Sequence, residues 1–222
     1  AVCNNNCVFC MEEDRDARYV NNSAMTPERV RWMLETHRGA EEVCFTSGEP
    51  TTRPELPEFV AWAKALGYRR VSIMTNGRRV GHLPYAAALA KAGMNRFYIS
   101  IHGHTQKLHE GLTRTPDSFA QTVAGLDAVT KLKRFGVELH TSTVVTDRNL
   151  PHMLEIYRFL RAHLSGRIRF DGDRVPIKVI VAPDGRIVAP VMEAMLRSVE
   201  VVLELPDDGE DGLQVMVSLE RL

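Results

Sequence analysis

The sequence is poor in cysteine, has no excess of either charge and contains no long apolar run. Its 222 residues include 28 Lys and Arg against 28 Asp and Glu, so the formal net charge at neutral pH is zero. Bulk binding of nucleic acid or of an anionic membrane surface requires a basic excess, so a small-molecule or peptide substrate is favoured. No stretch approaches the roughly 20 apolar residues that cross a bilayer, and no secretory signal is visible.

Four cysteines in a chain of this length are too few to build a disulfide scaffold. The low count is typical of a protein in a reducing compartment, so we expect a cytoplasmic location. The chain opens with Ala1 in place of an initiator Met, as a trimmed sequence would. Cys44 lies in an apolar segment and is expected to be a core residue, whereas the other three cysteines share one eight-residue segment.

Strand and helix patterns alternate along the first three quarters of the chain. Apolar, β-branched segments at 43–46, 71–75, 97–101 and 136–146 are typical of strands, and helical stripes lie between and after them. Thr26 is expected to cap the first helix and Asn149 the last. This alternation predicts a parallel sheet, either in a full or partial (β/α) barrel or in an open doubly wound sheet. In both architectures, ligands bind at the carboxyl ends of the strands.

The pattern changes after about position 166. The segment "IKVIVAPDGRIVAP" predicts a β-hairpin that turns at 183–185, and "VVLEL" and "LQVMVSL" flank an acidic loop in a similar manner. We therefore expect two units, a core at 1–166 and a small α+β appendage at 167–222. The appendage contains no cysteine, so it holds no auxiliary cysteine-bound cluster.

The spacing of Cys3, Cys7 and Cys10 indicates metal capture. Three cysteines cannot pair off in disulfides, and a nucleophilic cysteine does not require two companions. Structural zinc takes four ligands, so a fourth would come from Cys44 or from one of the eight histidines. An iron–sulfur cluster usually takes four cysteines, so three would leave one iron open to a ligand that is not protein. Both centres are compatible with these residues.

Two motifs together resemble the radical S-adenosylmethionine (radical SAM) superfamily. The first is CxxxCxxC with an aromatic residue, Phe9, directly before the last cysteine. The second is "TSGEPT" at 46–51, which is similar to the family's Gly-Gly-Glu-Pro element with Ser47 in place of the first glycine. The resemblance covers about residues 1–150. The family's opening strand normally precedes the first cysteine, so that strand is expected to be missing or trimmed.

The resemblance implies an enzyme with an α/β fold, a partial (β/α)6-type TIM barrel followed by the small α+β appendage. It implies a [4Fe-4S] cluster on Cys3, Cys7 and Cys10, whose open iron holds the amine and carboxylate of SAM. A reductant such as flavodoxin or ferredoxin would supply the electron that cleaves SAM. The resulting 5′-deoxyadenosyl radical would abstract hydrogen from a small-molecule or peptide substrate, in oxidoreductase or transferase chemistry.

Further cofactor-binding residues follow from the same resemblance. Glu49 is implied to accept hydrogen bonds from the ammonium group of SAM, and Gly48 lets the backbone approach the ligand closely. Ser100, at a strand end, is implied to lie near the ribose or the carboxylate of SAM. Arg114 is implied to pair with that carboxylate, and Phe9 completes the set.

Other polar residues carry more general expectations. His102, His104 and His109 crowd one segment, where surface or capping roles are expected. Arg78 and Arg79 follow an Asn-Gly turn and are expected to be solvated, with an anionic substrate as the alternative. Two rival functions also fit the cysteines: a zinc-binding structural module, and an iron–sulfur protein without catalysis, which SAM binding would distinguish.

Overall fold

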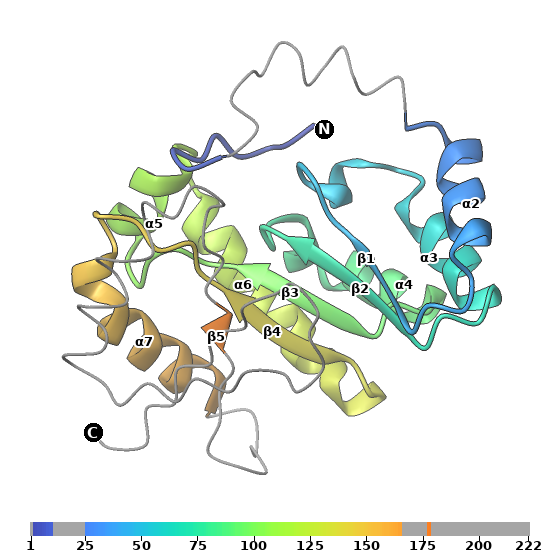
Figure 1. Ribbon diagram of the computed structural model, residues 1–222. Helices are drawn as coiled ribbons and strands as arrows, with labels where there is room; N and C mark the ends of the chain where they lie inside the picture. Colours follow the sequence, from blue (N-terminus) through green and yellow to red (C-terminus); the bar gives the residue numbers. More distant parts are fainter. Residues whose placement is uncertain (1, 11–24, 166–176, 179–222) are drawn as a thin grey trace, which may run out of the picture.

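The computed structural model describes residues 2–10, 25–165 and 177–178 of the chain (Figure 1). Its elements follow one another in the order α2 (Pro27–Thr36), β1 (Glu42–Phe45), η2 (Pro50–Thr52), α3 (Leu56–Ala65), β2 (Arg70–Thr75), η3 (Arg79–Gly81), α4 (Leu83–Ala92), β3 (Arg96–Ser100), α5 (Gln106–Thr113), α6 (Ser118–Leu132), η4 (Lys133–Phe135), β4 (Glu138–Ser142), η5 (Leu150–His152), α7 (Met153–Ser165) and β5 (Ile177–Lys178).

The strands form one sheet in the sequential order β1-β2-β3-β4-β5, and every pairing in it is parallel. Parallel neighbours require crossover connections, which the intervening helices supply. The α/β fold predicted from the alternating patterns is therefore confirmed, and the curved parallel sheet is a partial TIM-type barrel. In the described part of the chain, β1 is paired on one side only.

Local signals explain where the helices begin and end. Thr26 caps α2 as predicted, because its side-chain oxygen accepts a hydrogen bond from the backbone N–H of Arg29 at 3.3 Å. Gly93 ends α4 with φ of +124°, a conformation that favours glycine. Asn149 lies at the cap position of η5, which leads directly into α7, but its side chain forms no capping hydrogen bond. Its side-chain oxygen instead accepts the N–H of Thr146 at 2.6 Å, closing the turn before η5.

The hydrophobic core lies between the sheet and the helices α3, α4 and α6, which cover one face of it (Figure 1). Alternate strand residues point toward these helices, as the two-residue period of a strand requires. Val71, Ile73, Phe97 and Ile99 are all fully buried on this side. Burying one such side chain contributes roughly 1.5–3 kcal/mol, so this layer is the main source of the fold's stability.

The opposite face of the sheet carries mostly polar and charged side chains, with Met74 of β2 among the apolar exceptions. Cys44 lies on this face and is exposed, so the expectation that it belongs to the core is wrong. The physical reason is strand parity. Val43 and Phe45 point toward the helices and pack against the core, and the residue between them must therefore point the other way.

The sheet continues beyond position 166, because Ile177 of β5 pairs with Thr141 of β4. The predicted hairpin at 183–185 and the remainder of 179–222 lie outside the described residues. Among the residues that are described, no helix combines the length and the apolar character needed to cross a membrane.

Candidate cofactor site

The segment with three cysteines lies across the carboxyl ends of the strands, between the turn after β1 and helix α5 (Figure 1). We call residues 2–10 the cysteine loop. On the α5 side, the N–H of Asn6 donates to the carbonyl of Thr113 at 2.9 Å, and the N–H of Val8 donates to Leu112 at 2.8 Å. These carbonyls belong to the last turn of α5, where helical carbonyls have no intrahelical partner. The helix end and the loop therefore satisfy each other's backbone groups.

The β2 side of the loop is held by the turn that follows the strand. The Asn76 side chain donates to the Asn4 side chain at 2.6 Å. The Arg78 guanidinium donates to the backbone carbonyl of Asn4 and, at 2.9 Å, to the side-chain oxygen of Asn5. The expectation that Arg78 is a solvated residue is wrong, because its donors fix the spacer between the first two cysteines.

The Glu49 carboxylate is buried beneath this turn, with 2% of the residue exposed. One oxygen accepts the N–H of Thr51 at 3.1 Å, the Thr51 hydroxyl at 2.6 Å and the Thr75 hydroxyl at 2.7 Å. The other oxygen accepts the N–H of Asn76 at 2.7 Å. The Glu49 backbone N–H donates to Val2 at 2.8 Å. Glu49 thus joins the end of β1, the end of β2 and the start of the cysteine loop.

The backbone before Glu49 is left-handed at two successive residues. Ser47 has φ of +75° and Gly48 has φ of +57°. Glycine adopts this region without steric cost, whereas an L residue with a Cβ is disfavoured there by roughly 1–2 kcal/mol. The conformation explains the glycine at position 48. It also makes Ser47 a strained residue at the sheet edge where the cysteine loop lies.

Two buried histidines support the loop from below, and their expected surface or capping roles are wrong. His102 is 4% exposed and His109 is fully buried, with ring centroids 5.8 Å apart and nearly parallel planes. The Phe9 ring packs edge-on against His102 at 4.6 Å. Burial lowers the pKa of His102 to about 3, helped by the nearby His109, and lowers that of His109 to about 4.

Hydrogen bonds fix the tautomers of this pair. The N–H of Val144 donates to Nδ1 of His102, and the N–H of His102 donates to Nδ1 of His109, both at 3.2 Å. Each ring therefore carries its proton on Nε2. The Asn149 side chain also donates to the His102 carbonyl at 3.0 Å. His102 consequently ties the cysteine loop to α5 and to the segment that follows β4.

The three thiols are suited to a cofactor that binds on the exposed side of the loop. Cys3, Cys7 and Cys10 are all partly exposed, and the Asn5 N–H points at the Cys3 sulfur at 3.4 Å. An N–H that donates to sulfur stabilises a thiolate ligand. In ranges 2–10, 25–165 and 177–178, no three His, Cys, Asp or Glu side chains are grouped as ligands of a single metal ion. In an iron–sulfur cluster, by contrast, each thiolate binds its own iron atom.

Comparison with known families agrees with this geometry. The sequence profile of the Radical SAM superfamily matches residues 1–160. The chain belongs to the radical SAM superfamily. An AdoMet-dependent heme synthase of Oleidesulfovibrio alaskensis is 30% identical to it over 158 residues, which cover 70% of this chain and 39% of that protein. A probable GTP 3′,8-cyclase of Saccharolobus islandicus is 31% identical over 161 residues, 72% of this chain and 49% of that one. The chain thus spans less than half of either relative.

Solved radical SAM structures share the fold at low sequence identity. Native anSMEcpe with bound AdoMet and the Kp18Cys peptide superimposes with a TM-score of 0.55 and 18% identity, over 72% of this chain and 45% of that one. Streptococcus suis SuiB bound to S-adenosylmethionine gives a TM-score of 0.52 and 18% identity, over 89% of this chain and 46% of that one. At such identities the likeness establishes the fold of this radical SAM chain.

The remaining residues predicted for the radical SAM cofactor lie on two sides of the loop. Ser100 ends β3, and its hydroxyl lies 3.2 Å from that of Ser142, the register partner on β4. Arg114 directly follows the α5 turn that anchors the loop, in a left-handed conformation with φ of +50°. Its side chain is exposed and forms no hydrogen bond or ion pair with the described residues. It is therefore available to an external carboxylate.

The sequence indicated the cysteines of the candidate site but not the residues that anchor the cysteine loop. The "TNGR" stretch at 75–78 signalled a turn, but only the three-dimensional arrangement brings Asn76 and Arg78 to the cysteine loop. The His102–His109 spacing of seven residues spans a loop and a helix, so no periodic signal marked it. His109 lies one helical turn from Leu112 of α5, and this spacing was the one sign that it is buried.

Proposed function

We propose that this chain is the catalytic core of a radical SAM enzyme that binds a [4Fe-4S] cluster through Cys3, Cys7 and Cys10. When bound, the cluster and SAM supply the chemistry: one electron cleaves SAM, and the 5′-deoxyadenosyl radical produced removes a hydrogen atom from the substrate. The observation that carries the proposal is the attachment of the cysteine loop. Backbone and side-chain hydrogen bonds hold it at the carboxyl ends of the strands, where barrels of this type bind ligands.

The chain's own residues prepare this site before any cofactor arrives. Asn76, Arg78 and the end of α5 hold the loop through groups other than the three thiols, which are the proposed ligands. Because these anchors are independent of the cysteines, little chain ordering has to accompany cofactor binding. Phe9 packs on the neutral His102, and this contact positions the aromatic residue next to Cys10.

The proposed roles of Gly48, Glu49, Ser100 and Arg114 are supported to different degrees. Gly48 and Glu49 lie where the cysteine loop begins, and the Glu49 oxygen that bonds to Asn76 has capacity for a second donor such as an ammonium group. The exposed guanidinium of Arg114 suits a carboxylate. Ser100 presents a hydroxyl at a strand end, although it is already bonded to Ser142.

Several wider features belong to the same proposal. The substrate is a small molecule or a peptide, and a flavodoxin or ferredoxin is the reductant. A cytoplasmic location is supported by a cofactor site that requires reduced thiols. We retain a core at 1–166 with a C-terminal extension at 167–222, noting that β5 places two residues of the extension in the core sheet.

Anaerobic reconstitution with iron and sulfide tests the proposal. We expect a brown protein with about four irons per chain, from the cluster's stoichiometry, and release of 5′-deoxyadenosine on addition of dithionite and SAM. The Cys7→Ala variant should lose both, whereas the matched control Cys44→Ser should retain them. Stoichiometric zinc in place of iron would support the structural-module alternative. A cluster that forms without binding SAM would support a non-catalytic iron–sulfur protein. Either result would overturn the proposal.

A further inference from the structure

The face of the sheet opposite the helices differs from the interior of an ordinary barrel. Barrel interiors are usually filled by bulky branched aliphatic residues. Here the strand parity that buries Phe97 and Ile99 against the helices turns Arg96, Tyr98 and Ser100 of β3 to the other side. Their register partners on β4 are Glu138, His140 and Ser142. Apart from Met74, the register partner of Tyr98 on β2, the residues of β2, β3 and β4 on this face are polar or charged.

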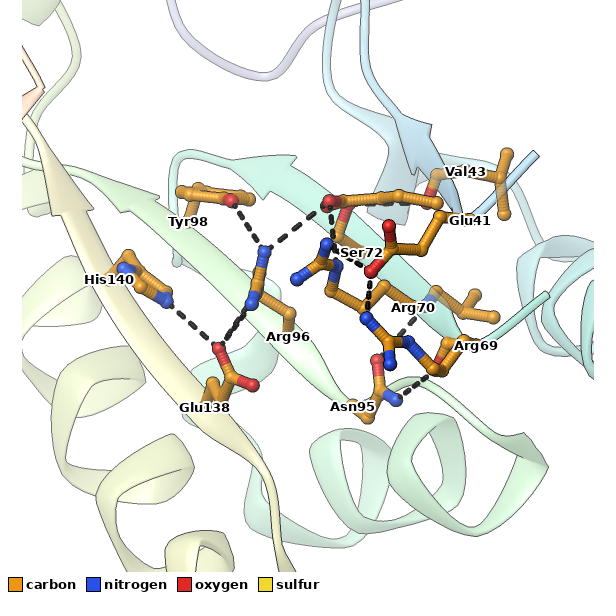
Figure 2. A network of polar contacts seen from close by, with 12 residues as sticks. Glu41, Val43, Arg69, Arg70, Ser72, Asn95, Arg96, Tyr98, Glu138 and His140 are labelled. Atoms are coloured by element: carbon orange, nitrogen blue, oxygen red, sulfur yellow. Dashed lines mark hydrogen bonds and ion pairs between the residues drawn. The ribbon is translucent and has the colours of Figure 1, made fainter. Parts of the chain in front are cut away.

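The amino-terminal end of this face is a network of ion pairs (Figure 2). Arg96 reaches Glu42 of β1 at 3.3 Å and Glu138 of β4 at 2.6 Å. Arg70 reaches Glu42 at 3.3 Å and Glu41 at 2.5 Å, and Arg69 also pairs with Glu41. Three guanidinium groups thus face three carboxylates. The network is electrically neutral, and its cations are already paired, so it offers no free cation for a phosphate or another anionic group.

Tyr98 and His140 lie one step nearer the carboxyl ends of the strands. Their rings are 5.0 Å apart and tilted by 31°, and both side chains are partly exposed (Figure 2). They are direct register partners on β3 and β4. Ser100 and Ser142, two residues further along the same strands, separate them from the strand ends by about 7 Å. If a substrate lies beneath the cysteine loop, the end of the substrate farthest from the cysteines would contact this pair of rings.

The hydrogen bonds of this pair determine what it can offer to a ligand. The Arg96 guanidinium donates to the Tyr98 hydroxyl at 3.4 Å, and since a guanidinium cannot accept, the hydroxyl proton of Tyr98 is left to donate. Nε2 of His140 lies 3.3 Å from the Glu138 carboxylate, which can only accept. Although burial opposes it, the bonds from His140 and Arg96 keep the pKa of Glu138 below its usual value, so this carboxylate is ionised. In the neutral imidazole of His140, this contact with Glu138 places the ring proton on Nε2 and presents Nδ1 as an acceptor.

We propose that Tyr98 and His140 are specificity residues that bind an uncharged amide of the substrate, so that the substrate is a peptide. This rests on the proposed function, because it concerns the substrate of the same site. An amide presents one C=O acceptor and one N–H donor in a plane, which matches the Tyr98 donor, the His140 acceptor and their flat ring faces. A nucleoside triphosphate fits poorly, because the cations of β1 to β4 on this face are paired with carboxylates.

Affinity selection on the chain as purified, without cluster or SAM, tests the proposal. The probe is a pool of N-acetylated, C-amidated tetrapeptides, with bound members identified by mass spectrometry, and GTP is tested in parallel. The variants Tyr98→Phe and His140→Phe keep a ring but lose the polar atom. The matched controls are Tyr85→Phe on α4 and His37→Phe after α2. If His140→Phe fails to fold, His140→Leu replaces it, because leucine also removes both ring nitrogens.

We expect a subset of peptides to be retained by the wild type and by both controls. Each of the two specificity variants should weaken that binding by about three- to tenfold, the effect of one uncharged hydrogen bond. No retained peptide, equal retention by the specificity variants, or retention of GTP in place of peptides would each overturn the proposal. Because the assay needs neither cluster nor SAM, its result is independent of whether 5′-deoxyadenosine is released.

Discussion

Gly125 of α6 lies against the backbone of Gly77, so closely that a Cβ added to Gly125 would stand 2.2 Å from the Gly77 carbonyl oxygen. The Thr122 hydroxyl, one helical turn earlier, donates to the Asn76 carbonyl at 2.8 Å. Asn76 in turn bonds to Asn4 of the cysteine loop. The close packing of α6 on the 76–77 turn therefore determines the position of the residue that holds the loop.

This contact predicts a strong effect of one methyl group. The Gly125→Ala variant should be destabilised by about 2–4 kcal/mol, because backbone and not a flexible side chain occupies the space for Cβ. The matched control is Gly111→Ala on α5, where a Cβ would meet nothing within 4 Å. The control should be stabilised by about 0.5–1 kcal/mol through helix propensity. Urea unfolding measures both, and equal stabilities for the two variants would contradict the packing described.

Removal of the Arg78 side chain should loosen the cysteine loop. Arg78→Ala removes the donors to Asn4 and Asn5, and we expect a loss of about 1–3 kcal/mol in stability. The thiols of the metal-free chain should also react faster with a chromogenic disulfide reagent, because the loop opens more often.

The control for this variant is Arg31→Ala, which removes an exposed ion pair with Glu35 within α2 and a cation–π contact with Trp62 at 5.6 Å. Together these contacts contribute about 1 kcal/mol, and thiol reactivity should not change. Unaltered thiol reactivity in Arg78→Ala would show that the loop holds its position without this residue.

The buried Glu49 should be intolerant of an isosteric amide. Glu49→Gln replaces one of two accepting oxygens by an NH2 group, which then faces N–H or O–H donors and leaves at least one of them unpaired. We expect a stability loss of about 2–4 kcal/mol. The half-exposed Glu55→Gln is the control and should change stability by less than about 1 kcal/mol. Thermal unfolding distinguishes the two variants. Equal midpoints would contradict the role of Glu49 in joining β1, β2 and the cysteine loop.

The buried histidine pair predicts a pH dependence of stability. His102 and His109 titrate near 3 and 4 in the folded chain against 6.5 in the unfolded chain. Between these values the unfolded chain binds more protons, so the contribution is complete above pH 6.5 and is lost as pH falls toward the folded values. At pH 5 the loss is on the order of 2 kcal/mol for each histidine.

Urea unfolding at pH 7 and pH 5 measures this effect, with the double variant His102→Asn/His109→Asn as the comparison. Asparagine keeps an acceptor for the two backbone N–H groups but does not titrate. The double variant should lack the part of the pH dependence that these two rings supply, on the order of 4 kcal/mol over this interval. An identical pH dependence in both proteins would show that the histidines are not buried as neutral rings.

The parts of the fold that local sequence determines were predictable. Strand and helix positions follow from periodicity and from end signals such as Thr26 and Gly93. The cysteine spacing and the Gly-Glu-Pro turn indicated the candidate cofactor site, which stays a prediction. The exposure of Cys44 was not predictable, because strand parity depends on which face the helices cover. The roles of Arg78, His102 and His109 depend on contacts between residues distant in sequence, which carry no local signal.

The attachment of the cysteine loop through Asn76, Arg78 and α5 has a consequence for the protein in a living cell. If the chain holds the proposed iron–sulfur cluster, iron starvation would leave it folded and resistant to proteases, because none of these anchors is a cysteine thiol. The cluster would then be rebuilt when iron returns, without new synthesis. Small zinc domains, by contrast, unfold when their metal is withdrawn and must refold when it is bound again.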